Sequence, residues 1–164
     1  MPREAPRVGP AMDPWGFTLV ELVVVMAIAA VLSAAIAPRF FTQLTFDERG
    51  YADQLAAALR STQKAAVVSG CAARLTLGAG SYVATQQAAS GNACLASDTT
   101  WSTALLGADG DPIQGTAPGG VAVSPAGVFQ FDAQGRLSSS PATSVTVGGH
   151  AISIDARSGY VQVQ

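Results

Sequence analysis

The chain has 164 residues, of which 49% are hydrophobic and 12% are charged, and its formal net charge is −2. The chain has a single histidine, His150. The sequence therefore lacks the residues expected of a Ser-His-Asp catalytic triad or a histidine-rich metal site. Asp109 and Asp111 are typical of a turn, because no glutamate follows at the spacing of a calcium loop. We therefore expect no enzyme activity, no catalytic residue, no cofactor and no metal.

Prolines recur at every fourth position at the start of the chain, at residues 2, 6, 10 and 14. Proline at this spacing excludes a helix and suggests a disordered arm. Met12 is an alternative start of translation, which would leave a very short segment, residues 12–16, ahead of Phe17. Acidic residues accompany the arginines here, so the positive-inside bias is weak.

Residues 17–37 are apolar except for Thr18, Glu21 and Ser33. At about 1.5 Å per residue, a helix of this length reaches across the roughly 30 Å hydrocarbon layer of a membrane. The composition leaves no polar face for a helix lying in the interface. The pattern predicts one N-terminal transmembrane helix.

Glu21 is the residue of this segment that needs an explanation. A carboxylate within the bilayer costs about 2.5–3.5 kcal/mol on insertion scales, so such a residue is expected to be functional and to have a partner. Nothing basic lies within the apolar run to pair with it.

A secretory signal peptide followed by an exported soluble β-domain is the alternative. Residues 22–32 would form its apolar region and residues 35–37 its small-residue cleavage box. Glu21 interrupts the apolar entry, and Pro38 would follow the cut where an extended, accessible backbone is required. Both details argue against this alternative.

The sequence Gly16-Phe17-Thr18-Leu19-Val20-Glu21, followed by the apolar run, resembles the leader junction of type IV pilins and type II secretion pseudopilins. The resemblance implies that residues 1–16 are a leader. It also implies that a prepilin peptidase cuts between Gly16 and Phe17 and methylates the new N-terminus of Phe17. Pro38 corresponds to the helix-kinking proline of that family.

Cleavage would give Glu21 its partner. The amine of Phe17 has an ordinary pKa of about 7.7–8.0, and Glu21 lies one helical turn away. In an assembled filament, the resemblance implies that the carboxylate neutralises the amine of an adjacent subunit. A shift in register would leave a charge unpaired in an apolar environment, so Glu21 is predicted to act in assembly.

The helix is expected to continue through residues 38–70 as an amphipathic segment, with a kink at Pro38 and a natural stop at Gly70. The predicted buried face consists of Tyr51, Leu55, Ala58, Leu59, Thr62 and Ala66. Asp53, Arg60 and Lys64 fall on the opposite face. Parts of residues 38–65 are similar to minor pilins of the mannose-sensitive haemagglutinin type.

Cys71 and Cys94 are the only cysteines, and both follow the apolar segment. An even count in an exported domain suggests a disulfide, which the loop-entropy model values at about 3 kcal/mol. Two buried free thiols are the alternative. We favour the disulfide because a domain so poor in charge gains from a covalent link.

Residues 71–164 are predicted to form a periplasmic β-rich domain. Short strands with alternating apolar residues are expected at residues 74–77, 82–85, 121–123, 129–131, 145–147, 152–154 and 161–163. The Gly148-Gly149 pair predicts a hairpin. One long helix packed on an antiparallel sheet is an α+β fold, which the resemblance makes a pilin fold.

Residues 127–136 and 152–161 resemble the C-terminal domain of GspH/FimT-type minor pilins. Residues 86–120 are expected to be mostly loop, with Trp101 as a candidate interface residue or as a cover for the sheet. His150 is expected at a strand edge.

Some GspH/FimT-type pilins bind DNA, but from Cys71 onward three arginines stand against five aspartates, which leaves a net charge of −2. This balance argues against a nucleic-acid partner.

The sequence thus predicts a minor pilin or pseudopilin, a structural subunit that initiates or caps a type IV pilus or a type II secretion pseudopilus. Its predicted location is the bacterial inner membrane, with a single pass and the C-terminal domain in the periplasm. Its predicted partners are other pilins or pseudopilins, a prepilin peptidase and an inner-membrane assembly platform.

Overall fold

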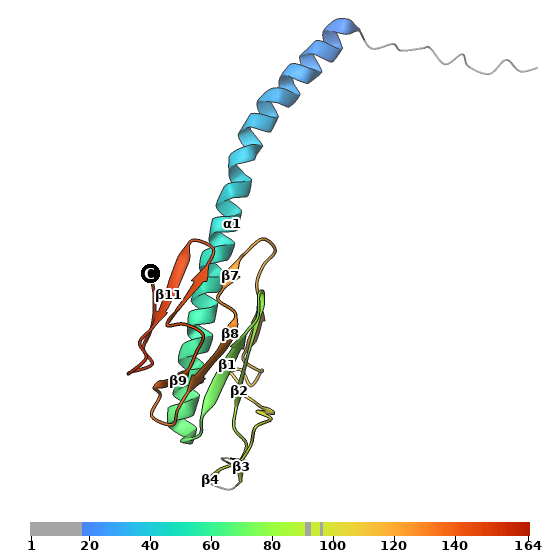
Figure 1. Cartoon of the computed structure of the whole chain (residues 1–164). Helices are drawn as coiled ribbons and strands as arrows, with labels where there is room; N and C mark the ends of the chain where they lie inside the picture. Colours follow the sequence, from blue (N-terminus) through green and yellow to red (C-terminus); the bar gives the residue numbers. More distant parts are fainter. Residues whose placement is uncertain (1–17, 91–92, 96) are drawn as a thin grey trace, which may run out of the picture. The chain divides into compact units, whose positions relative to one another are not determined.

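The structure is a computed structural model that describes residues 18–90, 93–95 and 97–164, with the side chains of residues 34–42 left out. It divides into two compact units, Met1–Arg39 and Phe40–Gln164. The first unit contains the beginning of a long helix, and the second contains the rest of that helix and all the strands (Figure 1). The predicted leader, residues 1–16, lies outside the described residues.

Helix α1 comprises Leu19–Ser69, and its end confirms the prediction from the sequence. Gly70 follows it with φ of 68°, the left-handed conformation that glycine adopts without steric cost at the end of a helix. Pro38 lies among the residues without described side chains, so the kink at this position remains a prediction.

The buried face of α1 in the second unit is the predicted one, and it is wider than expected. Tyr51, Leu55, Leu59 and Ala66 are at most 2% exposed, and Ala52 and Ala56 join them. The hydroxyl of the buried Thr62 donates a hydrogen bond to the carbonyl of Ala58 (2.8 Å).

The first sheet has six antiparallel strands in the order β5-β2-β1-β8-β9, with β6 also paired to β2. Its members are β1 (Ala73–Leu77), β2 (Ser81–Gln86), β5 (Thr103–Ala104), β6 (Gln114–Thr116), β8 (Gly127–Phe131) and β9 (Leu137–Ser139). The strands expected at residues 74–77 and 82–85 are confirmed, and they form a hairpin in which Leu77 lies opposite Tyr82. Alternation buries Leu75 and Leu77 on the inner face.

The second sheet has four antiparallel strands in the order β12-β11-β10-β7. Its members are β7 (Val123–Ser124), β10 (Ser144–Val147), β11 (His150–Ile154) and β12 (Val161–Val163). The Gly148-Gly149 turn joins β10 to β11, with Val147 opposite His150. The predicted hairpin is therefore confirmed, and His150 is the first residue of its second strand.

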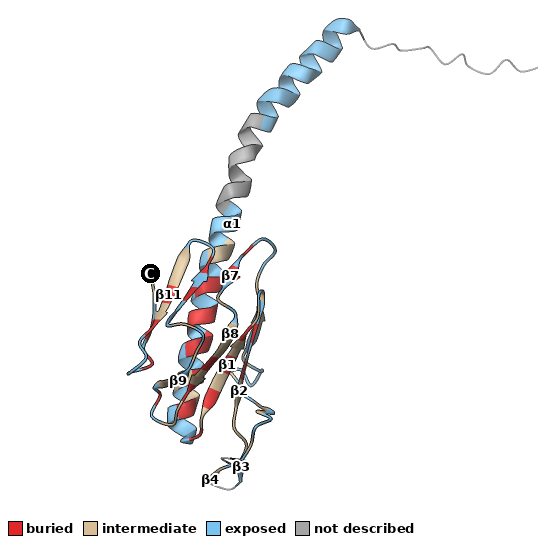
Figure 2. Cartoon of the chain, in the orientation of Figure 1, coloured by how far each residue is buried: buried red, intermediate tan, exposed pale blue. Residues whose placement is uncertain are grey.

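One hydrophobic core joins α1 to both sheets. Phe129 and Phe131 of the first sheet are fully buried, as are Val145 and Ile152 of the second. Figure 2 shows the buried residues gathered where the helix runs along the strands. The α+β class and the packing of the helix on antiparallel strands are thus confirmed.

The region expected to be mostly loop contains short strands that the sequence did not indicate. They are β3 (Ala89–Ser90), β4 (Ala93–Cys94), β5 and β6. Strand β9, which lies outside this region, was not predicted either. Strands of two or three residues are too short to show alternation. Their hydrogen-bonding partners lie on other strands, which a local pattern does not reveal.

Candidate functional site

Thr18 caps the N-terminus of α1. Its hydroxyl oxygen accepts a hydrogen bond from the backbone N–H of Glu21 (3.2 Å), and its carbonyl accepts one from the N–H of Leu22 (3.2 Å). A threonine at this position satisfies one of the N–H groups that the first turn of a helix leaves without a partner. This role was missed from the sequence, although threonine followed by glutamate three residues later is a known signal.

The cap places Glu21 in the first turn of the helix, where it is the acidic residue. A carboxylate there interacts favourably with the positive end of the helix dipole. The residue therefore has a local structural role in addition to the predicted pairing with an amine. The predicted processing residues, Gly16 and Phe17, lie outside the described residues.

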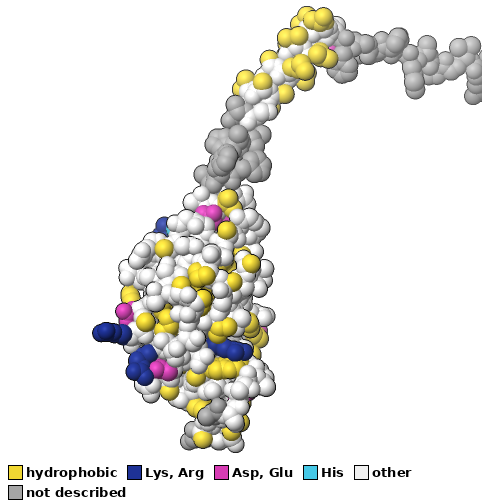
Figure 3. Space-filling model, in the orientation of Figure 1, with side chains coloured by type: hydrophobic (Ala, Val, Ile, Leu, Met, Phe, Trp, Pro, Cys, Tyr) yellow, Lys and Arg dark blue, Asp and Glu magenta, His cyan; other side chains and the backbone are white. Residues whose placement is uncertain are grey.

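The described part of the first unit is an apolar helix that exposes every side. All residues from Thr18 to Ser33 are exposed, and the large apolar side chains range from 49% at Val24 to 80% at Leu19. Figure 3 shows hydrophobic side chains over the visible face of this segment. We call residues 18–33 the stem. A helix that is apolar on all sides is normally covered by other molecules or by lipid.

Within the part of the chain that the structure describes, no helix meets the length and hydropathy required to cross a membrane.

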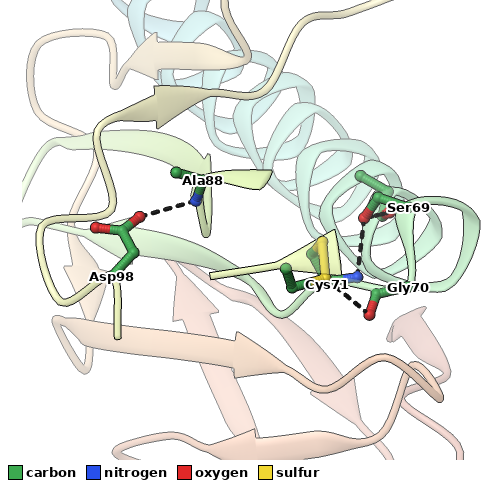
Figure 4. Close-up of a disulfide and its surroundings, with 7 residues drawn as sticks. Ser69, Gly70, Cys71, Ala88 and Asp98 are labelled. Atoms are coloured by element: carbon green, nitrogen blue, oxygen red, sulfur yellow. Dashed lines mark hydrogen bonds between the residues drawn. A yellow bond between two sulfur atoms is a disulfide. The ribbon is translucent and has the colours of Figure 1, made fainter. Parts of the chain in front are cut away.

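Cys71 and Cys94 form a disulfide, as predicted. Their Cα atoms are 5.4 Å apart, and the sulfur of Cys94 lies 3.3 Å from the carbonyl oxygen of Gly70. The backbone N–H of Cys71 donates to the hydroxyl of Ser69 (3.2 Å; Figure 4). The disulfide thus ties strand β4 to the end of α1.

Trp101 lies against Arg74 of strand β1, with the guanidinium carbon 4.7 Å from the ring centroid. Its φ is +55°, an uncommon conformation for a residue other than glycine. The half-buried ring thus covers the sheet, as one of the two predictions for this residue stated. Its second predicted role, as an interface residue, stays a prediction.

Asp98 holds the loop that carries Trp101. Its carboxylate accepts hydrogen bonds from the hydroxyl and N–H of Thr100 (2.6 and 2.9 Å), and from the N–H groups of Ala88 (2.8 Å) and Trp101 (3.3 Å). These bonds, that of the Thr100 hydroxyl foremost, lower the pKa of Asp98 from 3.8 to about 2. Nothing in the sequence pattern indicated this network.

Two side chains of α1 bind backbone carbonyls of the β-rich domain, one in strand β12 and the others in loops. Arg60 donates from Nε and Nη2 to the carbonyl of Val161 (3.2 and 3.1 Å). Gln63 donates to the carbonyls of Gly135 (3.1 Å) and Ser158 (2.8 Å). The helix therefore has a polar attachment beside its buried face.

The arginines of the β-rich domain are partly engaged. Arg136 pairs with Asp132 at 2.9 Å, and Arg74 stacks on Trp101.

The described residues contain no group of three or more histidine, cysteine or acidic side chains placed to bind a metal ion.

A family described as the prokaryotic N-terminal methylation motif matches residues 16–37. Comparison with curated proteins and with solved structures found no significant match. The matched segment begins at the predicted processing glycine and covers the cap and the whole stem. The chain therefore carries a type IV pilin-like prepilin signal at its N-terminus, which implies processing by a prepilin peptidase and assembly with other pilins.

Proposed function

We propose that the chain is a minor pilin or pseudopilin, a non-catalytic structural subunit of a type IV pilus or a type II secretion pseudopilus. Its place is at the initiation or the tip of the filament. Residues 1–16 are the leader, and prepilin peptidase cuts between Gly16 and Phe17. The resemblances to GspH/FimT-type and haemagglutinin-type minor pilins, and to the pilin fold, belong to this proposal.

The stem is the observation that carries the proposal. Its apolar side chains lie within the matched motif and are exposed on all sides, so another apolar surface must cover them. The inner membrane provides that cover before assembly, and neighbouring subunits provide it in the filament. The Cys71–Cys94 disulfide supports a periplasmic location for the C-terminal domain, because disulfides persist in oxidising compartments.

Glu21 is proposed to pair with the methylated amine of Phe17 of an adjacent subunit. The Thr18 cap fixes the start of the helix and with it the place of Glu21 in the first turn. The carboxylate therefore serves two purposes, the local stabilisation of the first turn and the register between subunits.

The N-terminus of the mature chain tests the proposal. We expect mass spectrometry of the chain from bacterial membranes to show a start at Phe17 with one added methyl group. In a strain without prepilin peptidase, the chain should keep its leader. A start at any other residue, or a soluble chain released without the stem as the signal-peptide alternative requires, would overturn the proposal.

Variants of Glu21 test its role in assembly. Glu21→Ala and Glu21→Gln should insert, fold and be processed, but enter filaments at least about tenfold less well, equivalent to ~1.4 kcal/mol. Ser33→Ala is the matched control, because the Ser33 hydroxyl donates to the carbonyl of Ala29 in the same helix. Incorporation of Glu21→Gln at the control level would refute charge pairing.

Genes beside this one distinguish the two machines. Major pilin and pilus assembly genes would indicate a type IV pilus, and a secretin with exported hydrolases would indicate type II secretion. The net charge of −2 from Cys71 onward disfavours nucleic acid as a ligand. We accordingly expect no shift of DNA by the chain, even at low salt.

A further inference from the structure

A groove of about 490 Å³ lies between α1 and strand β12, and two positively charged side chains line it. It is lined by Arg60, Ser61, Gln63, Lys64, Val67, Tyr160 and Val161. Val67 and Tyr160 are 51% and 62% exposed, so the groove also offers apolar surface. We call it the basic groove.

The charges of the basic groove have no acidic partner within the described residues. Arg60 is held in place by the carbonyl of Val161, to which it donates from Nε and Nη2. Its Nη1 is left to bind a ligand. Lys64 makes neither an ion pair nor a hydrogen bond in the described part of the chain, where the ion pair found is that of Arg136 with Asp132. The groove therefore suits a carboxylate.

A second groove, of about 240 Å³, has the opposite charge. Its lining includes Asp109 and Asp111 from the loop before β6, together with Gln54, Ala57 and Ser61 of α1. Asp109 and Asp111 are its only charged lining residues. We call it the acidic flank. Because Ser61 lines both grooves, they adjoin a shared exposed strip of α1.

We propose that the acidic flank of one copy of this chain docks into the basic groove of a second copy, with Asp111 meeting Lys64 and Arg60. The inference rests on the proposed function, because parallel stems in a membrane or a filament would hold the two copies side by side. The two surfaces differ, so the contact is heterologous, and a docked pair keeps the basic groove of one copy and the acidic flank of the other free.

The positions of the two grooves along α1 set the offset between copies. The helical lining runs over residues 54–61 in one and 60–67 in the other, a shift of about six residues. At 1.5 Å per residue, parallel copies are displaced by about 9 Å along the helix axis. Exposed ion pairs are individually weak, so the charges select which flanks meet while the apolar contacts and the stem hold the copies together.

The chain contains a favourable chemical probe for this contact, since Lys64 is its only lysine. We would treat a mixture of unlabelled and ¹⁵N-labelled purified full-length chain, reconstituted in liposomes, with a carbodiimide that joins an amine directly to a touching carboxylate. The expected product is a mixed-isotope peptide that links Lys64 to Asp111 or Asp109. A linked peptide in which both halves always carry the same isotope would show a link within one chain. That result, or the absence of any link, would overturn the proposal.

Charge reversal makes the test specific. Lys64→Glu and Asp111→Lys each remove one of the two groups that the reagent joins, so neither variant alone can form the link between residues 64 and 111. A mixture of the two variants should form it, with a yield at least tenfold above that of either variant alone. Arg157→Glu, an exposed change outside both grooves, should leave the yield unchanged. Failure of the mixture to restore the link would refute the pairing.

The result is separable from that of the proposed function. Liposomes containing the purified chain require neither processing nor an assembly machine, whereas the proposed function is judged by the mature N-terminus and incorporation into filaments. A missing link with a correct Phe17 terminus overturns the docking alone.

Discussion

Replacement of Gly159 by alanine should strongly destabilise the β-rich domain. Gly159 has φ of +66°, and an added Cβ would overlap the carbonyl oxygen of Gly135 and lie 2.6 Å from Nε2 of Gln63. That same Nε2 donates to the carbonyls of Gly135 and Ser158. One methyl group therefore disturbs both the turn and the attachment of α1 to it.

The expected loss in unfolding free energy is about 4 kcal/mol. A side chain in the left-handed region costs about 1–2 kcal/mol. Steric displacement of packed groups costs about 1–3 kcal/mol, and each lost hydrogen bond costs about 0.5–1.5 kcal/mol. This is a large part of the roughly 5–15 kcal/mol that stabilises a typical domain.

Two other glycines separate the backbone contribution from the steric one. Gly70→Ala changes a residue with φ of 68° and open space around it, so about 1 kcal/mol should be lost. Gly149→Ala changes a glycine with neither restriction, and stability should stay within about 0.5 kcal/mol of the wild type.

Denaturant unfolding of the full chain in detergent, followed by circular dichroism, measures all three variants. A result in which Gly159→Ala loses no more than Gly70→Ala would refute the argument from contact with Gly135 and Gln63.

Three further predictions concern the cap, the disulfide and the Asp98 network. Thr18→Ala should cost about 1 kcal/mol at the start of α1 and raise hydrogen exchange of the Glu21 amide about fivefold by NMR. Loss of the disulfide in Cys71→Ser/Cys94→Ser should lower the unfolding free energy by about 3 kcal/mol, and an unchanged denaturation midpoint would contradict the constraint. The lowered pKa of Asp98 means that its stabilisation is complete above pH 3.8 and is lost as pH falls through about 2, so Trp101 fluorescence should change there in wild type and not in Asp98→Asn.

Much of the fold follows from local features of the sequence. The end of α1 was predictable because Gly70 admits a left-handed conformation, and the buried face around Leu55 and Leu59 because a helix repeats every 3.6 residues. Alternation predicted strands β1, β8, β10 and β11 in the same way. The cap at Thr18 was also within reach of the sequence.

The features of the candidate site that consist of consecutive residues were also predictable from the sequence. The prepilin signal, the apolar stem and the acidic residue at its start are properties of consecutive residues, so the sequence alone determined them. The pairing of Cys71 with Cys94 was predictable for a simpler reason, because a chain with two cysteines allows only one internal disulfide.

Tertiary structure decided what depends on residues far apart in the chain. The short strands β3–β6 and β9 exist because neighbouring backbone groups are available to pair with them, which their own few residues do not encode. Asp98 acts through the backbone of Ala88 and Trp101, and Gln63 through loops 72 and 95 residues away. Arg60 and Lys64 lie next to Ser61 in the helix itself, but Asp109 and Asp111 come to lie beside Ser61 only when their loop packs against the helix.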